Sequence, residues 1–487
     1  MRLKKSYISF FTGMFLFLFF LFINPFQLDV KACKVLAVGV LMITWWISEA
    51  LPMPAVALIP IVLFPLLKIE TISATTAPYA NEVVFLFMGG FMIGLGIEKW
   101  NLHKRIALSI VRFTGTSGNR IILGFILSTG FISMWLSNTA TTMMMFPIAL
   151  SVISVISEGK MHEKGYRNFA MSLMLTIAYA SNFGGIATII GTPPNVAYVA
   201  YISKKFNYEI PFANWAIVCF PIALILLFSL YFVLTRILFP NKIASNLDMQ
   251  NVISGELQEL GSITVPEKRV MAIFGITALL WIFRDLINQL GVVKLDDNMI
   301  AIAGALLMFI VPSGNLKENE EPQMILDWHD TKKMAWGILL LFGGGITLAN
   351  AMEKAGLMEM LGNWIASFSG TNTFVLVLVI TTISIFISEV MSNIAQVIVF
   401  APVVTGIGIA VGINPLILGV AMTLASSCAS MMPMGTPPNA IAFASGHIKI
   451  KEMIKAGFVM NIISIVLIVF FCYKILPLVV EFVTAVH

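Results

Sequence analysis

Apolar residues occur along this chain in runs of about twenty, and short polar or charged segments separate the runs. A helix of that length crosses the hydrocarbon core of a bilayer. In lipid, each backbone N–H and C=O must be bonded within its own segment, so the runs predict helices. The predicted spanning helices cover residues 7–24, 32–50, 53–68, 82–98, 168–190, 214–238, 269–290, 298–312, 334–352, 415–434 and 455–478.

Two further apolar stretches, 119–156 and 372–411, are each interrupted in the middle by a polar triplet. We interpret them as re-entrant hairpins, helix–turn–helix units that enter and leave on the same side. The pattern as a whole predicts an all-α polytopic membrane protein with about 11 transmembrane helices and two re-entrant helical hairpins.

The composition supports this class. Of the 487 residues, 58% are hydrophobic and 11% are charged, whereas a soluble domain carries about 25% charged residues. These values exclude a soluble globular protein and a disordered one. The net charge of +5 comes without a basic stripe, so nucleic acid is not an expected partner.

The basic residues divide unevenly between the two sides of the predicted helices. If the N-terminus is inside and each hairpin adds no net crossing, most of the 30 Lys and Arg residues fall inside. Cytoplasmic loops of membrane proteins carry such an excess. The distribution predicts a multi-pass protein of the cell membrane with a cytoplasmic N-terminus and an extracytoplasmic C-terminus.

The chain matches itself when it is shifted by 255 residues. The matched pairs include Gly89 and Gly344, Ser133 and Ser388, Ser137-Asn138 and Ser392-Asn393, and Pro147 and Pro402. Later the shift becomes 244, where Gly-Thr-Pro-Pro-Asn at 191–195 matches 435–439, and the missing residues correspond to the polar loop 157–167. Corresponding helices are an odd number of spans apart, which predicts an inverted-topology repeat, a feature of secondary transporters.

Amphipathic stretches at 101–114 and 356–369 precede the two hairpins. We interpret both as helices that lie along the membrane surface, with a plain loop as the alternative.

The polar triplet Ser137-Asn138-Thr139 lies between two apolar helical arms, with Ser133 one helical turn earlier. Free carbonyls at the end of one arm suit a small hard cation, and free N–H groups at the start of the next suit an anion. The second copy offers Ser388, Ser392 and Asn393 at the same spacing. The alternative is a helix break that is capped by its own Ser and Asn.

The duplicated Gly-Thr-Pro-Pro-Asn motif predicts a second kind of break, because proline removes backbone donors and stops a helix. Irregular backbone at membrane depth is tolerated only beside a cavity or inside protein. We therefore expect two facing half-sites, each formed by a hairpin tip and a broken helix, with an anion between them and a cation behind each tip.

Charged residues are nearly absent from these segments. No Lys, Arg or His lies in the four breaks, so neutral donors, helix ends and bound cations must hold the anion, which favours sodium coupling. Glu389 is the one acid in a hairpin. It is either a functional charge at membrane depth or a brace that pairs with another helix.

The paired Ser-Asn-Thr-like and Gly-Thr-Pro-Pro-Asn motifs resemble those of the divalent-anion/sodium symporter family, over about residues 30–480. The resemblance implies a homodimer in which a scaffold holds an elevator-like transport domain. It assigns residues 1–118 to N-terminal scaffold helices, 119–238 to the first half of the transport domain, 239–371 to a linking loop and further scaffold helices, and 372–487 to the second half of the transport domain.

The resemblance also implies site residues. The first sodium site corresponds to Ser133, Ser137, Asn138 and the carbonyl of Gly191, and the second to Ser388, the carbonyl of Met391, Asn393 and the carbonyl of Gly435. The substrate contacts correspond to Asn138, Thr139, Pro193, Ser392, Asn393, Thr436 and Pro437. Ile394 stands where the family usually has Thr, and the loss of one charge-assisted hydrogen bond costs roughly 1.5–3 kcal/mol.

The expected function is sodium-coupled symport of a C4-dicarboxylate such as succinate, malate or fumarate, with two or more Na⁺ sites and an elevator mechanism. Open alternatives are a sodium-coupled carrier of citrate or sulfate, a dicarboxylate exchanger and, more remotely, an ion channel. An enzyme is not expected, because the five His residues lie in loops, surface segments or the tail, away from the breaks.

Overall fold

The structure is a computed structural model that describes residues 2–156, 163–241, 243, 247–291, 293–314, 323–357, 360 and 372–479. Within these ranges the chain forms helices joined by turns and loops, with one isolated antiparallel bridge between Pro312 and Met324. The predicted all-α fold is confirmed.

The helices before residue 240 include both motifs of the first repeat. They are α1 (Arg2–Ile23), α2 (Val30–Ser48), α3 (Met53–Val56), α4 (Ile59–Leu66), α5 (Ile72–Thr76), η1 (Ala77–Ala80), α6 (Glu82–Lys99), α7 (Leu102–Thr114), α8 (Gly118–Ser133), α9 (Asn138–Ile156), α10 (Lys164–Gly185), α11 (Pro193–Phe206), α12 (Phe212–Phe232) and η2 (Val233–Leu238).

The helices after residue 240 include both motifs of the second repeat. They are α13 (Leu247–Glu259), α14 (Val265–Gln289), α15 (Asp297–Ile310), η3 (Trp328–Lys333), α16 (Trp336–Lys354), α18 (Thr373–Ser388), α19 (Asn393–Val411), α20 (Pro415–Ser427), α21 (Pro437–Ala444), α22 (Ile450–Phe470), η4 (Phe471–Ile475) and α23 (Leu476–Val479).

Eight helices in the described part of the chain are long and apolar enough to cross a membrane. They are Val30–Ser48, Ile72–Lys99, Asn138–Ile156, Phe212–Leu238, Val265–Gln289, Trp336–Lys354, Asn393–Val411 and Ile450–Val479. Shorter apolar helices accompany them, among them Gly118–Ser133 and Thr373–Ser388, the first arms of the two predicted hairpins. The chain is a multi-pass helical membrane protein, and the number of about 11 spans stays a prediction.

Three predicted spans are not continuous helices. The predicted helix 53–68 is divided into α3 and α4, and each part has a proline in its first turn. The predicted helices 168–190 and 415–434 end early, at Gly185 and Ser427. Irregular backbone follows until Pro193 and Pro437 start new helices, because proline is favoured at the first helical position.

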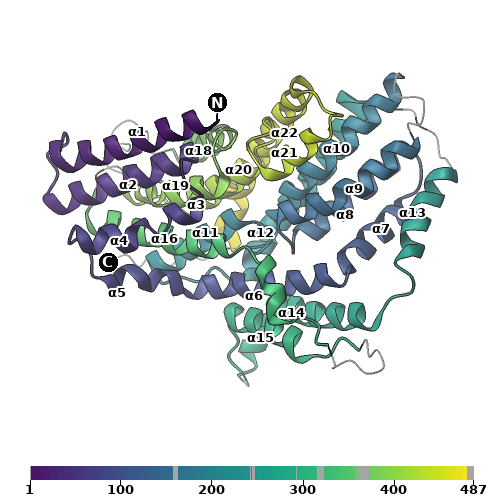
Figure 1. Cartoon of the computed structure of the whole chain (residues 1–487), viewed down its shortest axis with the longest axis horizontal. Coiled ribbons are helices and arrows are strands. Elements are labelled where there is room, and N and C mark those ends of the chain that lie inside the picture. The colour runs from purple at the N-terminus through teal and green to yellow at the C-terminus, as the bar shows by residue number, and fades with distance from the viewer. Residues whose placement is uncertain are drawn as a thin grey trace.

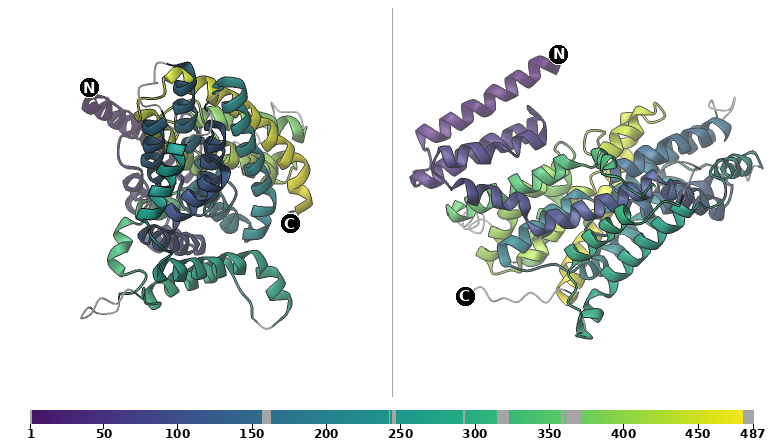
Figure 2. Two further views of the ribbon diagram at one scale, coloured as in Figure 1. Left: turned by 90° about the vertical axis from the view of Figure 1, so that its right-hand side faces the viewer. Right: turned by 60° about the horizontal axis from the view of Figure 1, so that its bottom comes forward.

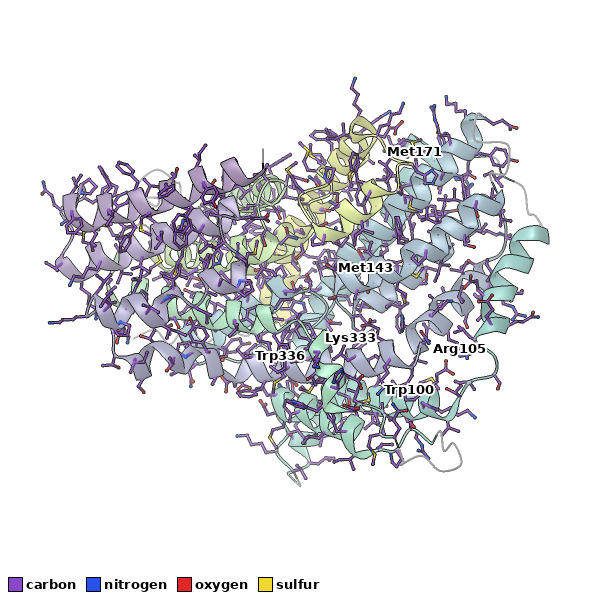
Figure 3. The ribbon with its side chains drawn as sticks, viewed as in Figure 1. Trp100, Arg105, Met143, Met171, Lys333 and Trp336 are labelled. Atoms are coloured by element: carbon purple, nitrogen blue, oxygen red, sulfur yellow. The ribbon has the colours of Figure 1, made fainter. Side chains whose placement is uncertain are left out.

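Of the two predicted surface helices, the first is present as α7, whose buried side includes Leu102, Leu108 and Val111. The second prediction, 356–369, lies largely outside the described residues. Trp100 and Arg105 join α6 and α7 to the segments beyond residue 260 (Figure 3). The Trp100 Nε1–H donates to the Ile325 carbonyl at 2.9 Å, and Arg105 Nε donates to Glu267 Oε1 at 2.7 Å.

The helices form two apolar cores. In the smaller core, α1 to α4 pack with one face of α16, and the Phe10 ring stacks on Trp45 with a centroid distance of 4.8 Å. The larger core contains both hairpins and both broken helices. Figure 1 shows α1 and α2 at one edge of the molecule and α14 and α15 below α6. Figure 2 shows that α1 and α2 lie side by side, and α2 also contacts α19 of the second hairpin.

The helix that follows each break packs against the hairpin of the other repeat. Helix α21, after the second break, packs against α9 and α10 of the first repeat. Helix α11, after the first break, packs against α19 and α20 of the second. Each hairpin is therefore covered by a helix from the other repeat, and this brings the four breaks close together.

We predict that Gly184→Ala lowers the melting temperature, because an added Cβ would overlap the Gly130 carbonyl where α10 crosses α8. Separating two packed helices costs about 1–3 kcal/mol. The matched control is Gly165→Ala on the same helix, where an added Cβ meets nothing within 4 Å. Thermal unfolding in detergent compares the two, and equal melting temperatures would contradict the close crossing.

Candidate functional site

The first hairpin turns between Ser133, the last residue of α8, and Asn138, the first residue of α9. The Ser133 side chain is fully buried, and its Oγ lies 2.8 Å from both Asn138 Oδ1 and the Ser181 carbonyl. Since a hydroxyl has one proton, it can donate to only one of these oxygens at a time. With the Asn138 amide in this orientation, the tip gathers more oxygen atoms than its own protons can satisfy.

The second hairpin repeats this arrangement. Ser388 Oγ lies 2.6 Å from Asn393 Oδ1 and 2.5 Å from the Ser426 carbonyl. In both repeats the serine and the asparagine are five residues apart. The same spacing gives the same hydrogen bond at each tip. The sequence did not indicate the carbonyls of Ser181 and Ser426, because every residue carries a carbonyl and the tertiary packing decides which one faces the tip.

The asparagine of each Gly-Thr-Pro-Pro-Asn motif holds its own loop together. Asn195 Nδ2 donates to the Thr188 carbonyl at 2.8 Å and lies 3.4 Å from the carbonyls of Gly185 and Ile186. Asn439 Nδ2 lies 3.3 Å from the Ala429 carbonyl and 3.2 Å from the Met432 carbonyl. Both amides satisfy carbonyls that the broken helix leaves without an intrahelical partner.

Oxygen atoms surround Gly191, the glycine of the first motif. A Cβ at this position would lie 2.9 Å from the Ser133 carbonyl and 3.0 Å from the Met134 carbonyl, so only glycine fits. The Asn138 amide atom that faces Ser133, Oδ1, lies 3.3 Å from the Gly191 carbonyl and 3.1 Å from the Ser181 carbonyl. We call Ser133 Oγ, Asn138 Oδ1 and the carbonyls of Ser181 and Gly191 the first oxygen group.

This group has the chemistry of a sodium site. Unwound backbone carbonyls and the C-terminal ends of half-helices coordinate Na⁺ in secondary transporters. Three of the four predicted ligands, Ser133, Asn138 and Gly191, meet here. The fourth, Ser137, directs its hydroxyl elsewhere, because Ser137 Oγ accepts the Ala140 N–H at 3.3 Å and caps α9.

The second oxygen group contains Ser388 Oγ, Asn393 Oδ1 and the Ser426 carbonyl. Gly435 adjoins it, since a Cβ there would lie 3.3 Å from the Ser388 carbonyl and 3.4 Å from the Met432 carbonyl. Met391, the remaining predicted ligand, lies in the tip, where its N–H donates to the Ile387 carbonyl at 3.2 Å.

Glu389 binds the second hairpin to the second broken helix. Its carboxylate accepts the backbone N–H groups of Ser430, Met431 and Met432 at 2.8–3.0 Å. The carboxylate also accepts a hydrogen bond from Asn461 Nδ2 at 2.7 Å, and Glu389 is only 4% exposed. These four donors give the bracing interpretation of Glu389 its physical basis.

In the first repeat a neutral side chain makes the corresponding link. Met134 stands where the second repeat has Glu389. The Thr188 hydroxyl donates to the Met134 carbonyl at 2.5 Å and accepts the Gly191 N–H at 3.0 Å. The two repeats thus join tip and loop with different chemistry.

The residues predicted to contact the anion lie at the starts of four helices. Asn138 and Thr139 begin α9, Pro193 begins α11, Asn393 begins α19 after its N-cap Ser392, and Pro437 begins α21 after its N-cap Thr436. Helix N-termini carry a partial positive charge and attract anions. The arrangement therefore suits an anion although no basic side chain lies in the breaks.

Ile394 borders an open pocket of about 640 Å³. The residues that line it are Glu49, Ala50, Leu51, Pro52, Met53, Pro54, Ala335, Gly337, Ile338, Leu341 and Ile394. The tip of the second hairpin is therefore accessible from the α2–α3 connection and the start of α16.

Multi-pass helices with two pairs of interrupted helices, whose ends converge on oxygen groups, define a secondary transporter. The family model described as the sodium:sulfate symporter transmembrane region matches residues 4–480, so the chain belongs to this family. The resemblance that the motifs indicated is confirmed.

Two relatives of this chain carry the same name. The sodium-dependent dicarboxylate transporter SdcS of Staphylococcus aureus strain USA300 is 40% identical over 464 residues, which cover 94% of this chain and 89% of the relative. SdcS of strain MSSA476 is 39% identical over the same lengths.

We predict that Glu389→Gln lowers the melting temperature, because one carboxylate oxygen that accepts backbone N–H groups is replaced by an NH₂ donor. A buried donor left without an acceptor costs about 1–3 kcal/mol. Glu163→Gln is the control, since Glu163 is exposed and its side chain does not cap α10. Thermal unfolding without substrate is the measurement. Equal melting temperatures for both variants would contradict the bracing role.

Proposed function

We propose that this chain is a sodium-coupled symporter of a C4-dicarboxylate such as succinate, malate or fumarate in the cell membrane. The observation that carries the proposal is the pair of oxygen groups, one at each hairpin tip, beside four helix N-termini. The name of the relatives supports both the cation and the anion.

Cation and anion depend on each other in this arrangement. Asn138 and Asn393 each offer an amide oxygen to a cation group, and each begins a helix whose N–H groups face the anion. A bound Na⁺ orders the tip and adds a positive charge beside it, so the anion binds more tightly afterwards. Linkage requires that the anion in turn increases sodium affinity. Two groups imply at least two Na⁺ per anion.

Sulfate is the second candidate for the anion. Ile394 removes a hydroxyl that would otherwise meet a carboxylate, and the family description refers to sulfate. A carrier of citrate and a dicarboxylate exchanger use the same groups and differ only in the anion or in the direction of exchange.

We further propose that the hairpins and broken helices, in 119–238 and 372–487, form a transport domain that moves as an elevator against a scaffold of 1–118 and 239–371 in a homodimer. The exchange of α11 and α21 between repeats supports one rigid transport domain. The smaller core, which α1 to α4 form with one face of α16, supports a distinct scaffold, and Met391 and Ala395 of the second hairpin pack into it.

In the orientation predicted from the basic residues, the pocket at Ile394 opens toward the cytoplasm. Polar links close the opposite side. Ser203 Oγ donates to Glu82 Oε1 at 2.9 Å, the Phe212 N–H donates to Asp297 Oδ2 at 2.9 Å, and Lys205 pairs with Glu353. Each link joins the proposed transport domain to the scaffold, so we propose that this is the inward-facing state.

We predict that uptake of succinate into proteoliposomes requires Na⁺, with an activation curve that needs more than one Na⁺. Asn138→Ala and Asn393→Ala should each raise the half-activating Na⁺ concentration by roughly ten- to a hundredfold, since each removes one ligand.

The control for these variants is Asn288→Ala, whose side-chain amide bonds to the Leu295 backbone beyond the end of α14, away from the breaks. Full uptake in choline or K⁺ buffer would refute sodium coupling. An unchanged Na⁺ requirement in both hairpin variants would refute the assignment of the oxygen groups.

We predict that Ile394→Thr changes anion selectivity, because it restores a hydroxyl donor at the accessible tip. Affinity for succinate should increase by up to roughly ten- to a hundredfold if the hydroxyl meets a carboxylate. The measurement is the ratio of succinate to sulfate as competitors of uptake, with Ile338→Val on the scaffold side of the same pocket as the control. An unchanged ratio would remove Ile394 from the anion site.

A further inference from the structure

Asn182, near the end of α10, contacts both half-sites and belongs to neither motif. It is 1% exposed. Its Oδ1 lies 3.4 Å from Asn138 Nδ2 in the first half-site. Its Nδ2 lies 3.1 Å from Thr436 Oγ1 and 3.3 Å from Asn439 Oδ1 in the second. At the corresponding point of the second repeat the chain has serine, at Ser426 and Ser427, so the first repeat alone supplies this amide.

The second half-site determines which way the Asn182 amide points. Asn439 uses its Nδ2 for the carbonyls of Ala429 and Met432, so its Oδ1 can only accept. Asn182 must therefore present Nδ2 to Asn439 and Oδ1 to Asn138. The three amides form a relay that begins in the loop of the second broken helix and ends at the first hairpin tip.

The relay matters because the Asn138 amide has a competing orientation. Turned over, its Nδ2 would donate to Ser133 Oγ at 2.8 Å, the Ser181 carbonyl at 3.1 Å and the Gly191 carbonyl at 3.3 Å. That orientation would place an NH₂ group inside the first oxygen group, where a cation could not bind. It would also turn Asn138 Oδ1 toward Asn182 Oδ1, and two acceptors in contact repel each other.

We propose that Asn182 is a positioning residue that keeps the Asn138 amide oxygen in the first oxygen group and so maintains the first sodium site. The proposal rests on the proposed function. It also makes the first sodium site dependent on the fold of the second half-site, because the amide relay begins at Asn439.

The test uses three variants of the full chain. Asn182→Leu keeps the branched shape of the side chain and removes the acceptor, so Asn138 is free to turn over. Asn182→Asp keeps an acceptor for Asn138 Nδ2, and in its neutral acid form its O–H can donate to Asn439 Oδ1 in place of the amide. Thr176→Val is the matched control, a fully buried side chain on the same helix whose hydroxyl has no partner within the described residues.

The readout is the increase in melting temperature of the purified protein as Na⁺ replaces choline at constant ionic strength, without dicarboxylate. A ligand that binds only the folded state raises the free energy of unfolding. Well above the dissociation constant, the increase grows with the logarithm of the ratio of ligand concentration to dissociation constant. We expect Asn182→Leu to need about tenfold more Na⁺, or more, for the same rise in melting temperature. Asn182→Asp and Thr176→Val should remain near the wild type.

Wild-type sodium affinity in Asn182→Leu would overturn the proposal. An equal loss in Asn182→Leu and Asn182→Asp would also overturn it, because the loss would then reflect packing and not the acceptor. If Asn182→Leu does not fold, Asn182→Ala replaces it, with the same two outcomes.

The failure of the proposed function is distinguishable from the failure of this inference. If Na⁺ does not stabilise the wild type and succinate uptake proceeds without Na⁺, the proposed function fails. If the wild type depends on Na⁺ and Asn182→Leu has the same sodium affinity, only the role of Asn182 is refuted.

Discussion

A helix that breaks inside a membrane must find partners for the backbone groups that the break exposes, and this requirement shapes the centre of the molecule. Four breaks lie close together at the depth of the membrane, where lipid offers no partners for their ends. Asn195 and Asn439 bond carbonyls of the interrupted helices, and Ser133 and Ser388 meet carbonyls across the hairpin tips. Two kinds of group converge at the breaks, carbonyl oxygens behind the tips and helix N-termini. These are the groups that bind a cation and an anion.

The two repeats meet this requirement with different side chains. In the first repeat Thr188, a neutral residue, links the tip to the loop of the broken helix. In the second repeat Glu389 makes the link with a full negative charge, which four donors already occupy. A carboxylate satisfied in this way is stable at depth, whereas an unpaired one would be costly. The repeat therefore conserves the geometry of the oxygen groups while the supporting contacts have diverged.

The sequence predicts the parts of the site that depend on local spacing. Ser133 and Asn138, and likewise Ser388 and Asn393, are close because five residues span one tight turn between helices, and the duplication makes the pattern unlikely to be accidental. The sequence does not predict the Ser181 carbonyl, the relay through Asn182, or the partners of Glu389. Those contacts join segments about forty to more than two hundred and fifty residues apart, and the helix packing alone brings them together. The division of 53–68 into α3 and α4 was missed because Pro54 and Pro60 are compatible with the first turn of a helix and do not by themselves reveal a break.

On the proposed function, the absence of basic residues from the breaks has a consequence for motion. A dicarboxylate carries two negative charges. Helix N-termini attract them but add no net charge to the domain, because each partial positive end is matched by a partial negative end at the C-terminus of the same helix. A domain that moved through the membrane with a net charge would meet a large penalty from the low dielectric. Two Na⁺ in the two oxygen groups cancel the two negative charges of the dicarboxylate, so the bound ions and anion together add no net charge to the domain. Na⁺ alone or the dicarboxylate alone would add a charge. Coupling then follows from electrostatics, since only the fully loaded or the empty domain moves easily, and each further Na⁺ beyond two would make transport respond to the membrane potential.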